Sequence, residues 1–170
     1  NGPTFYGVLV SLCLPLEAGG RACAQIHIIV LWIGAGLAKM GPWFSGVNGT
    51  FICASFWLTG KPWLWRLMYR GENDLRPTLF AEILGRIAAT AEWASPQVLL
   101  FATEPILVHF AVFVLVAMHA YIIMLCTADL CVWNSFTALA AIYLFVCSGS
   151  LGFDYAGWFS APMCVRAFNV

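Results

Sequence analysis

The sequence contains few charged residues. Only 9% of its 170 residues are Asp, Glu, Lys or Arg, and the eight acidic and eight basic side chains give no formal net charge. Soluble domains average about 25% charged residues, so this chain has too few to cover a globule in water. The balanced charge also gives no basic surface for nucleic acid, and we expect no nucleic-acid partner.

The sequence also lacks the cysteine patterns of disulfide frameworks and metal centres. Its seven cysteines are an odd number, form no CxxC motif and lie mostly within apolar runs. Such cysteines behave as small buried apolar residues, so we expect no metal site. No internal repeat is visible either, which argues against a self-contained carrier.

Apolar residues, in contrast, are abundant. The chain is 62% hydrophobic and has a mean hydropathy of +0.86, which fits a bilayer as solvent. We therefore predict an integral membrane protein of a bacterial inner membrane or an organellar membrane. The length fits one transmembrane helical domain over residues 1–170. The first residue, Asn1, is not Met, which predicts a processed or partial chain.

Four apolar segments predict membrane-embedded helices, and a fifth, shorter one predicts the end of another. The fold class is therefore all-α: a polytopic helical membrane protein with about four to five membrane-embedded helices. Gly41-Pro42 ends the first of these segments, Thr78 caps the second, and Pro96 is expected to interrupt the second. The four segments are residues 22–39, 79–101, 106–126 and 132–148, and the short one is residues 5–16.

Residues 44–70 have a different character, because tryptophans alternate with basic side chains. Aromatic and basic residues together favour the headgroup layer, so we predict an interfacial segment and membrane lipids as partners. A polar turn is expected at residues 70–77, and a lumenal or surface loop at residues 149–163. The alternating residues are Trp57, Lys61, Trp63, Trp65, Arg66 and Arg70.

The basic residues also indicate an orientation. Six of the eight lie between the first predicted span and the early part of the next, from Lys39 to Arg86. By the positive-inside rule, this side faces the cytoplasm or its equivalent. The same argument counts against glycosylation at Asn48, although Asn48-Gly49-Thr50 matches the acceptor pattern.

Several ionisable residues fall within or beside the predicted spans. Each costs about 2.5–3.5 kcal/mol to insert, so each needs a reason. Lys39 either anchors a helix end by snorkelling or acts in chemistry. Glu82 and Arg86, four apart, are able to pair. Glu92 either pairs with Lys39 or a histidine across the bundle, or serves as a proton acceptor or ligand-orienting carboxylate.

Three histidines, His27, His109 and His119, also lie in the predicted spans. Each imidazole either forms a structural hydrogen bond or binds a haem iron or a chlorophyll magnesium axially. Ten residues separate His109 from His119. Their directions therefore differ by about 80° and their heights by about 15 Å, so they do not hold one metal together.

Three segments resemble a known membrane family. They are "LWIGAGLAKMGPWF" (31–44), "NDLRPTLFAEILGRIAATAE" (73–92) and "MHAYIIMLCTADLCVWNSF" (118–136). Three elements are the most specific. They are Lys39 after a Gly-Ala-Gly helix end, the motif Asp74-Leu75-Arg76-Pro77 together with Glu92, and His119 followed by Trp133-Asn134. In order and spacing they resemble the transmembrane family called domain of unknown function 3556. The resemblance covers about residues 22–148 and implies the C-terminal half of a longer member, without an established function.

Two further motifs resemble other membrane proteins. "GAGLAKMGPW" is similar to a helix end of vitamin K-dependent carboxylases, where a lysine acts as a base on a quinol, which would make Lys39 the candidate base. "AEILGRIAATAEW" (81–93) looks like the chlorophyll-binding helix of light-harvesting proteins. In those proteins a Glu and an Arg flank an Asn-Gly step. Here the spacing from Glu82 to Arg86 is one residue too short and the asparagine is absent. We therefore reject membership of the light-harvesting family, while contact with a pigment stays open.

Two functional hypotheses follow. In the first, the protein binds or acts on a lipid or quinone-like molecule through a catalytic cluster of Lys39, Glu92 and His119. In the second, it is a non-catalytic subunit of a photosynthetic or respiratory complex. Chlorophyll, carotenoid or haem would then contact His27, His109 or His119, and Trp133 and Asn134 would add cofactor contacts. The first requires the polar residues to converge in a cavity.

Overall fold

The computed structural model describes residues 19–125, 128–148 and 151–161, without the side chains of residues 126–129. The all-α prediction is confirmed, with one small hairpin added. The short predicted segment 5–16 lies outside the described residues. The elements are α2 (Gly20–Ala38), α3 (Trp43–Ala54), α4 (Pro62–Met68), β1 (Tyr69–Gly71), β2 (Asp74–Pro77), α5 (Leu79–Phe101), α6 (Pro105–Leu125), α7 (Ala128–Ile142), the π-helix η2 (Tyr143–Cys147) and α8 (Tyr155–Ser160).

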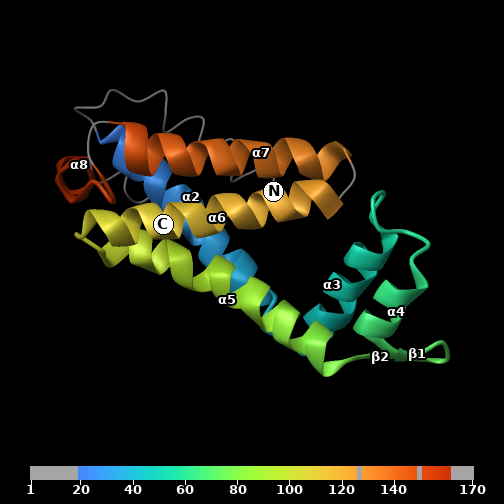
Figure 1. Ribbon diagram of the computed structural model, residues 1–170. Helices are drawn as coiled ribbons and strands as arrows, with labels where there is room; N and C mark the ends of the chain where they lie inside the picture. The colour runs from blue at the N-terminus through green and yellow to red at the C-terminus, as the bar shows by residue number, and fades with distance from the viewer. Residues whose placement is uncertain (1–18, 126–127, 149–150, 162–170) are drawn as a thin grey trace.

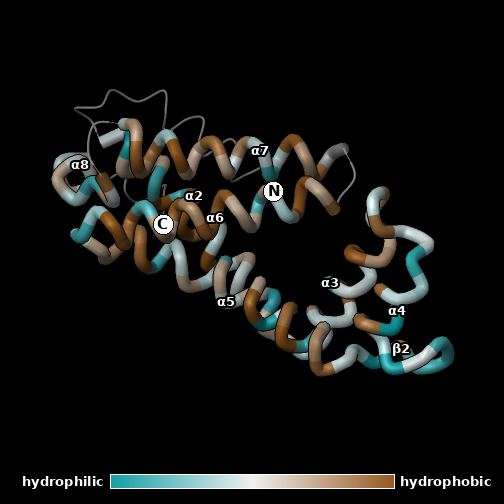
Figure 2. The backbone as a smooth tube through the Cα atoms, in the orientation of Figure 1, coloured by the Kyte–Doolittle hydropathy of each residue, from teal (hydrophilic) through white to brown (hydrophobic). Residues whose placement is uncertain are grey.

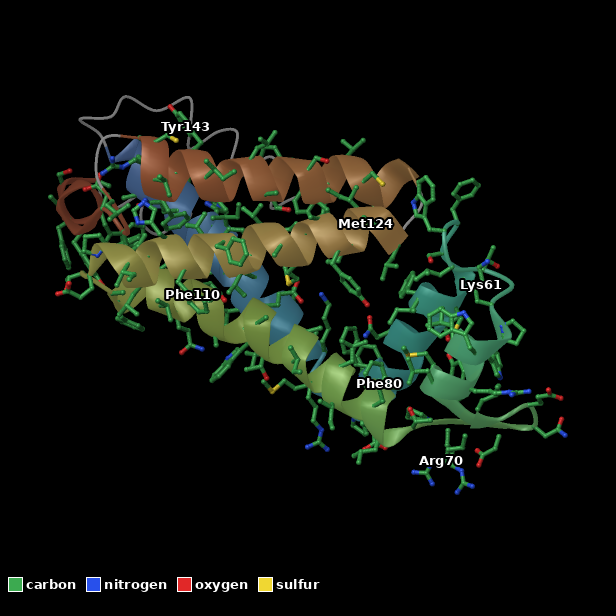
Figure 3. All side chains as sticks on the ribbon, viewed as in Figure 1. Lys61, Arg70, Phe80, Phe110, Met124 and Tyr143 are labelled. Carbon is green, nitrogen blue, oxygen red and sulfur yellow. The ribbon has the colours of Figure 1, made fainter. Side chains whose placement is uncertain are left out.

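Four long helices form a bundle, and the short elements gather at its two ends (Figure 1). Helix α6 packs against both α5 and α7, and α2 packs against α5. The bundle core is apolar and includes the fully buried side chains of Trp32, Leu99, Leu115 and Phe145. Large apolar side chains also point outward from the long helices, among them Phe110 and Met124 (Figure 3). A bilayer is the solvent that suits such a surface.

Three described helical segments are long and apolar enough to cross a membrane: Gly20–Ala38, Pro105–Leu125 and Leu130–Cys147. Helix α5 has 23 residues, which also exceeds the bilayer core in length. It carries Glu82, Arg86 and Glu92, which make it more polar than the other three. The predicted four to five embedded helices therefore correspond to three clear spans and the more polar α5 beside them.

Helix α5 begins and ends where the sequence predicts. The Thr78 side chain accepts a hydrogen bond from the Ala81 N–H and caps its first turn, as expected for an N-cap threonine. The predicted interruption at Pro96 is wrong, because the helix continues through it and Pro96 is fully buried. Nearby, the Gln97 side chain donates to the Trp93 carbonyl at 3.2 Å. Neighbouring helices and polar side chains make an internal proline tolerable in a membrane helix.

Helices α3 and α4 and the hairpin form a separate lobe at one end of the bundle (Figure 1). Its own small core contains Ile52, Leu64 and Met68. Phe56, Trp57 and Trp63 are exposed on the lobe, and Figure 3 shows Lys61 and Arg70 on it as well. The interfacial role of residues 44–70 stays a prediction with which these exposed aromatic and basic side chains agree.

The predicted polar turn at residues 70–77 is a two-stranded antiparallel hairpin, β1–β2. It is the most hydrophilic part of the lobe in Figure 2. Asp74 and Arg76 form an exposed ion pair there at 2.7 Å. Hydrogen bonds from Arg76 lower the pKa of Asp74 to about 2, so the Asp74 carboxyl is ionised at neutral pH.

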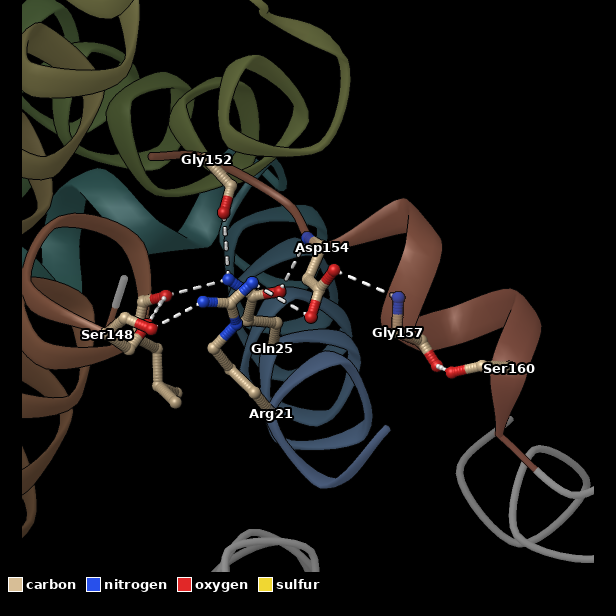
Figure 4. A network of polar contacts seen from close by, with 8 residues as sticks. Arg21, Gln25, Ser148, Gly152, Asp154, Gly157 and Ser160 are labelled. Carbon is tan, nitrogen blue, oxygen red and sulfur yellow. Dashed lines mark hydrogen bonds and ion pairs between the residues drawn. The ribbon is translucent and has the colours of Figure 1, made fainter. Parts of the chain in front are cut away.

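The opposite end of the bundle is closed by a polar network (Figure 4). Gln25, fully buried in α2, donates to the carbonyls of Leu144 and Gly152 at 2.7 and 2.9 Å and accepts from the Asp154 N–H at 2.9 Å. Arg21 forms an ion pair with Asp154 at 2.8 Å. Asp154 also caps α8 by accepting from the Gly157 N–H.

The prediction of a lumenal or surface loop over residues 149–163 is wrong at Tyr155–Ser160, which is helix α8. Residues 149–150 and 162–163 lie outside the described residues. An aspartate N-cap before a short aromatic segment is the local signal that predicts such a helix.

Candidate functional site

A cavity of about 290 Å³ lies between the long helices and α3. Five residues singled out from the sequence line it: Lys39 directly after α2, and, from three different helices, Glu92 of α5, His119 of α6, and Trp133 and Asn134 of α7. The convergence that the first hypothesis requires is thus present. The remaining lining is mostly apolar, with Leu31, Phe44, Phe51, Ile122 and Leu125 among its members.

Lys39 and Glu92 form an ion pair in this cavity. The Glu92 side chain is 5% exposed and the Lys39 side chain 26%. The Lys39 ammonium also lies 5.8 Å from the centre of the Phe44 ring, within the range of a cation–π contact. The structural interpretation of the sequence paired Glu92 with Lys39 or a histidine across the bundle, and the structure shows the pair with Lys39.

A close approach of two helices brings the pair together. A Cβ atom added to Gly36 of α2 would lie 2.6 Å from the Trp93 backbone nitrogen in α5. Only glycine therefore fits at this position. Gly36 is one turn before Lys39, and Trp93 directly follows Glu92, so the contact fixes the distance between the two charged residues.

His119 is held in one orientation by hydrogen bonds to both ring nitrogens. The Trp32 indole Nε1–H donates to His119 Nε2 at 2.9 Å. Since indole is only a donor, Nε2 is the acceptor and the proton of the neutral ring lies on Nδ1. His119 Nδ1 then donates to Asn134 Oδ1 at 2.7 Å. Asn134 Nδ2 donates onward to the Leu130 carbonyl at 2.7 Å, which fixes the amide orientation.

This arrangement leaves neither nitrogen of His119 available for an axial bond to a metal. Its role is to supply a rigid polar wall for the cavity. Thr137, fully buried, adds a hydroxyl 3.3 Å from His119 Nδ1.

The other two histidines lie away from the cavity lining. His27 Nδ1 lies 3.3 Å from the Cys23 carbonyl oxygen, and His109 Nδ1 lies 2.7 Å from the Pro105 carbonyl oxygen, each within its own helix. His109 is exposed and His27 is half-buried. Within the described residues, no group of three or more His, Cys, Asp or Glu side chains is placed to hold a metal ion.

Several residues that line the cavity were not predicted from the sequence as site residues. Asn48 is buried, and its Oδ1 accepts from the Tyr121 hydroxyl at 3.3 Å. Burial also removes Asn48 from the reach of a glycosylating enzyme. A polar residue in an apolar run could have indicated Asn48 and Thr137, whereas Trp32 and Phe44 carry no signal that separates them from core or interfacial aromatics.

A second cavity of about 480 Å³ adjoins the first and shares Lys39 and Phe44 with it. Its polar lining comes from Ser45 of α3 and from Glu82, Arg86 and Thr90 of α5. Glu82 and Arg86 were expected to be able to pair, but no ion pair joins these two described residues. Both side chains instead border the cavity with opposite charges.

The two cavities together combine an apolar compartment with a charged one. The Lys39–Glu92 pair at their boundary contains one proton donor and one proton acceptor, the groups needed for general acid–base chemistry. The apolar compartment suits a hydrocarbon chain or ring.

Comparison with known families identifies the chain. The family model described as a transmembrane protein of unknown function, DUF3556, matches residues 4–166. The chain belongs to the DUF3556 family. The match extends beyond the 22–148 region of the sequence resemblance and, with the three spans, makes this DUF3556 protein an integral membrane protein. Neither a curated protein nor a solved structure matches it, and the likeness to vitamin K-dependent carboxylases receives no support.

Proposed function

We propose that this DUF3556 protein binds a membrane lipid or a quinone-like molecule in the cavity of about 290 Å³ lined by Lys39, Glu92 and His119. The observation that carries the proposal is the convergence of these polar residues on an otherwise apolar cavity. Small-molecule sites are typically apolar, with a few fixed polar groups that orient the ligand. The volume is close to the lower limit of such sites, about 300 Å³, so a ligand would enter with only part of its length.

The polar groups of the cavity are fixed in position before any ligand binds. His119 is bonded through both ring nitrogens, and Lys39 and Glu92 hold each other. Groups that are already ordered lose little entropy on binding, which favours affinity. The Lys39 ammonium and the Glu92 carboxylate keep hydrogen-bonding capacity beyond their own ion pair, which suits a carbonyl or hydroxyl of the ligand. A catalytic role for Lys39, Glu92 and His119 would use the same site.

A cavity-filling substitution tests the proposal. Ala88 of α5 lines the cavity, whereas Ala120 of α6 is exposed and does not. Native mass spectrometry of the detergent-purified protein would be titrated with a short-chain ubiquinone and with a short-chain phospholipid. We expect Ala88→Phe to reduce binding of at least one probe by about tenfold or more, which corresponds to about 1.4 kcal/mol.

The matched control is Ala120→Phe, which adds the same ring to the lipid-facing surface and should bind as the wild type does. Circular dichroism and size-exclusion profiles would establish that both variants are folded. If Ala88→Phe binds both probes as tightly as Ala120→Phe, the proposed site is wrong.

The alternative, a subunit of a larger complex that contacts pigment or haem, makes a different prediction. Because both nitrogens of His119 are engaged, an axial ligand would have to come from His27 or His109. An absorption spectrum of the natively purified protein separates the two proposals. Stoichiometric chlorophyll, carotenoid or haem would favour the subunit, and a colourless protein would favour the lipid or quinone site.

A further inference from the structure

We propose that the ligand is a zwitterionic aminophospholipid, such as phosphatidylethanolamine, whose headgroup occupies the second cavity between Glu82 and Arg86. This inference rests on the proposed function, because the acyl chain would occupy the first cavity. It selects a phospholipid over a quinone, since a neutral quinone ring needs no charged compartment.

The charges of the second cavity match such a headgroup. Glu82 and Arg86 stand four residues apart on α5, so their Cβ atoms are about 5–6 Å from each other. Among the described residues, neither side chain has an ion-pair or hydrogen-bond partner, although both line the cavity. An Arg guanidinium is well suited to phosphate oxygens, and a carboxylate accepts hydrogen bonds from a primary ammonium.

The charge balance also favours a zwitterion. Lys39 is already neutralised by Glu92, so the second cavity has one uncommitted positive group and one uncommitted negative group. A purely anionic headgroup would satisfy Arg86 and be repelled by Glu82. A headgroup with a phosphate and an ammonium joined by an ethanolamine linker satisfies both residues.

Other groups around the cavity support the phosphate end. The hydroxyls of Ser45 and Thr90 line it, and helix α3 begins beside it at Trp43 without a side-chain cap on its first turn. The N–H groups of a first turn carry a partial positive charge that favours an anion.

The order of the two cavities along α5 also fits a lipid. Glu82 and Arg86 are near the lobe, while Ala88 and Glu92 of the first cavity are further along the helix. Six residues separate Arg86 from Glu92, which is about 9 Å of helix. A headgroup at the lobe would therefore extend its chain towards the bundle core.

The test uses the detergent-purified protein and native mass spectrometry with three phospholipids of identical short acyl chains: phosphatidylethanolamine, phosphatidylcholine and phosphatidylglycerol. We expect phosphatidylethanolamine to bind most tightly, since the quaternary ammonium of phosphatidylcholine donates no hydrogen bond and phosphatidylglycerol has no ammonium. Arg86→Gln should weaken all three lipids by about tenfold, as expected for a lost charge-assisted hydrogen bond. Glu82→Gln should weaken phosphatidylethanolamine and leave phosphatidylglycerol unchanged or tighter.

The controls are Arg66→Gln and Glu72→Gln, which make the same changes at exposed positions of the lobe that line neither cavity. Wild-type binding by Arg86→Gln, a preference for phosphatidylglycerol, or equal loss of all lipids in Glu82→Gln would each overturn the headgroup assignment. The proposed function, binding in the first cavity, is tested separately. It is wrong if Ala88→Phe binds phosphatidylethanolamine as the wild type does, whatever the result for Arg86→Gln.

Discussion

Glu92 and Lys39 form one ion pair but differ in their access to solvent. The Glu92 side chain is 5% exposed, whereas that of Lys39 is 26% exposed and lies at a helix end. A long lysine side chain at such a position is able to turn its ammonium towards the headgroup layer when its partner is removed. The buried carboxylate of Glu92 has no such alternative.

The two single substitutions should therefore have unequal effects on stability. We expect Lys39→Met to lower the free energy of unfolding by about 3 kcal/mol, because it leaves a buried charge uncompensated. Glu92→Gln should cost about 1 kcal/mol, close to the worth of an ordinary hydrogen bond. The measurement is unfolding in mixed micelles of dodecyl maltoside and SDS, followed by circular dichroism.

The double variant is the control for this prediction. Removing both charges should recover part of the loss of Lys39→Met, because no isolated charge remains. Equal costs for the two single variants would contradict the burial argument and indicate that water reaches Glu92.

Single residues also show how far the sequence alone leads to the site. A partner for Glu92 could be expected because an isolated carboxylate in an apolar helix demands one, and of the two predicted kinds of partner, Lys39 or a histidine, the structure has Lys39. His119 was recognised as a histidine within a predicted span, and Asn134 through the resemblance to the DUF3556 family. The identity of their neighbours was not predictable: Trp32 donates to His119 across 87 positions of sequence, and such a contact depends on helix packing that no local pattern encodes.

At the scale of elements, the contact between α2 and α5 depends on Gly36. The space around it is too small for a methyl group, whereas Gly34, two residues earlier in the same helix, has no heavy atom within 4 Å of an added Cβ. The two glycines thus provide a matched pair within one helix.

We expect Gly36→Ala to lower the free energy of unfolding by about 1–3 kcal/mol, the usual cost of overpacking, and to weaken ligand binding by moving Lys39 from Glu92. Gly34→Ala should be neutral or stabilise the protein by up to about 1 kcal/mol, since alanine is the better helix former. The same micelle titration measures both. A stable Gly36→Ala would show that α2 and α5 are able to separate without loss.

The elements were predicted best where a local signal exists. Thr78 predicted the start of α5, and the Gly41-Pro42 break predicted the end of α2. The interruption predicted at Pro96 was wrong, because the rule that proline ends a helix comes from helices in water, whereas membrane helices tolerate an internal proline, and here Pro96 is buried inside the bundle. The π-helix η2 was not predictable, since its buried residues Leu144 and Phe145 give the same apolar pattern as an α-helix.

At the scale of the whole molecule, the two ends of the bundle differ in charge. The lobe end holds the six basic residues from Lys39 to Arg86, while the other end has the Arg21–Asp154 pair. Figure 2 shows the hydrophilic hairpin on the lobe side. The positive-inside rule therefore predicts a cytoplasmic lobe.

Site-specific labelling tests this orientation. Glu72 in the hairpin and Thr103 in the connection between α5 and α6 are both exposed, at opposite ends. In a variant without native cysteines, Glu72→Cys should react with a membrane-impermeant maleimide in inside-out vesicles, and Thr103→Cys in right-side-out vesicles. Labelling of both from the same side would contradict the described arrangement of the bundle in the membrane.

The network around Gln25 has a consequence for the order in which the protein is made. Its partners Leu144 and Asp154 are synthesised 119 and 129 residues later, or about 6–25 seconds at the usual rate of translation. During that time α2 holds a polar amide without its final partners. Insertion of α2 into lipid before η2 and α8 are made would therefore leave the Gln25 amide without these partners, and we expect α2 to be stable in the bilayer only when packed against them.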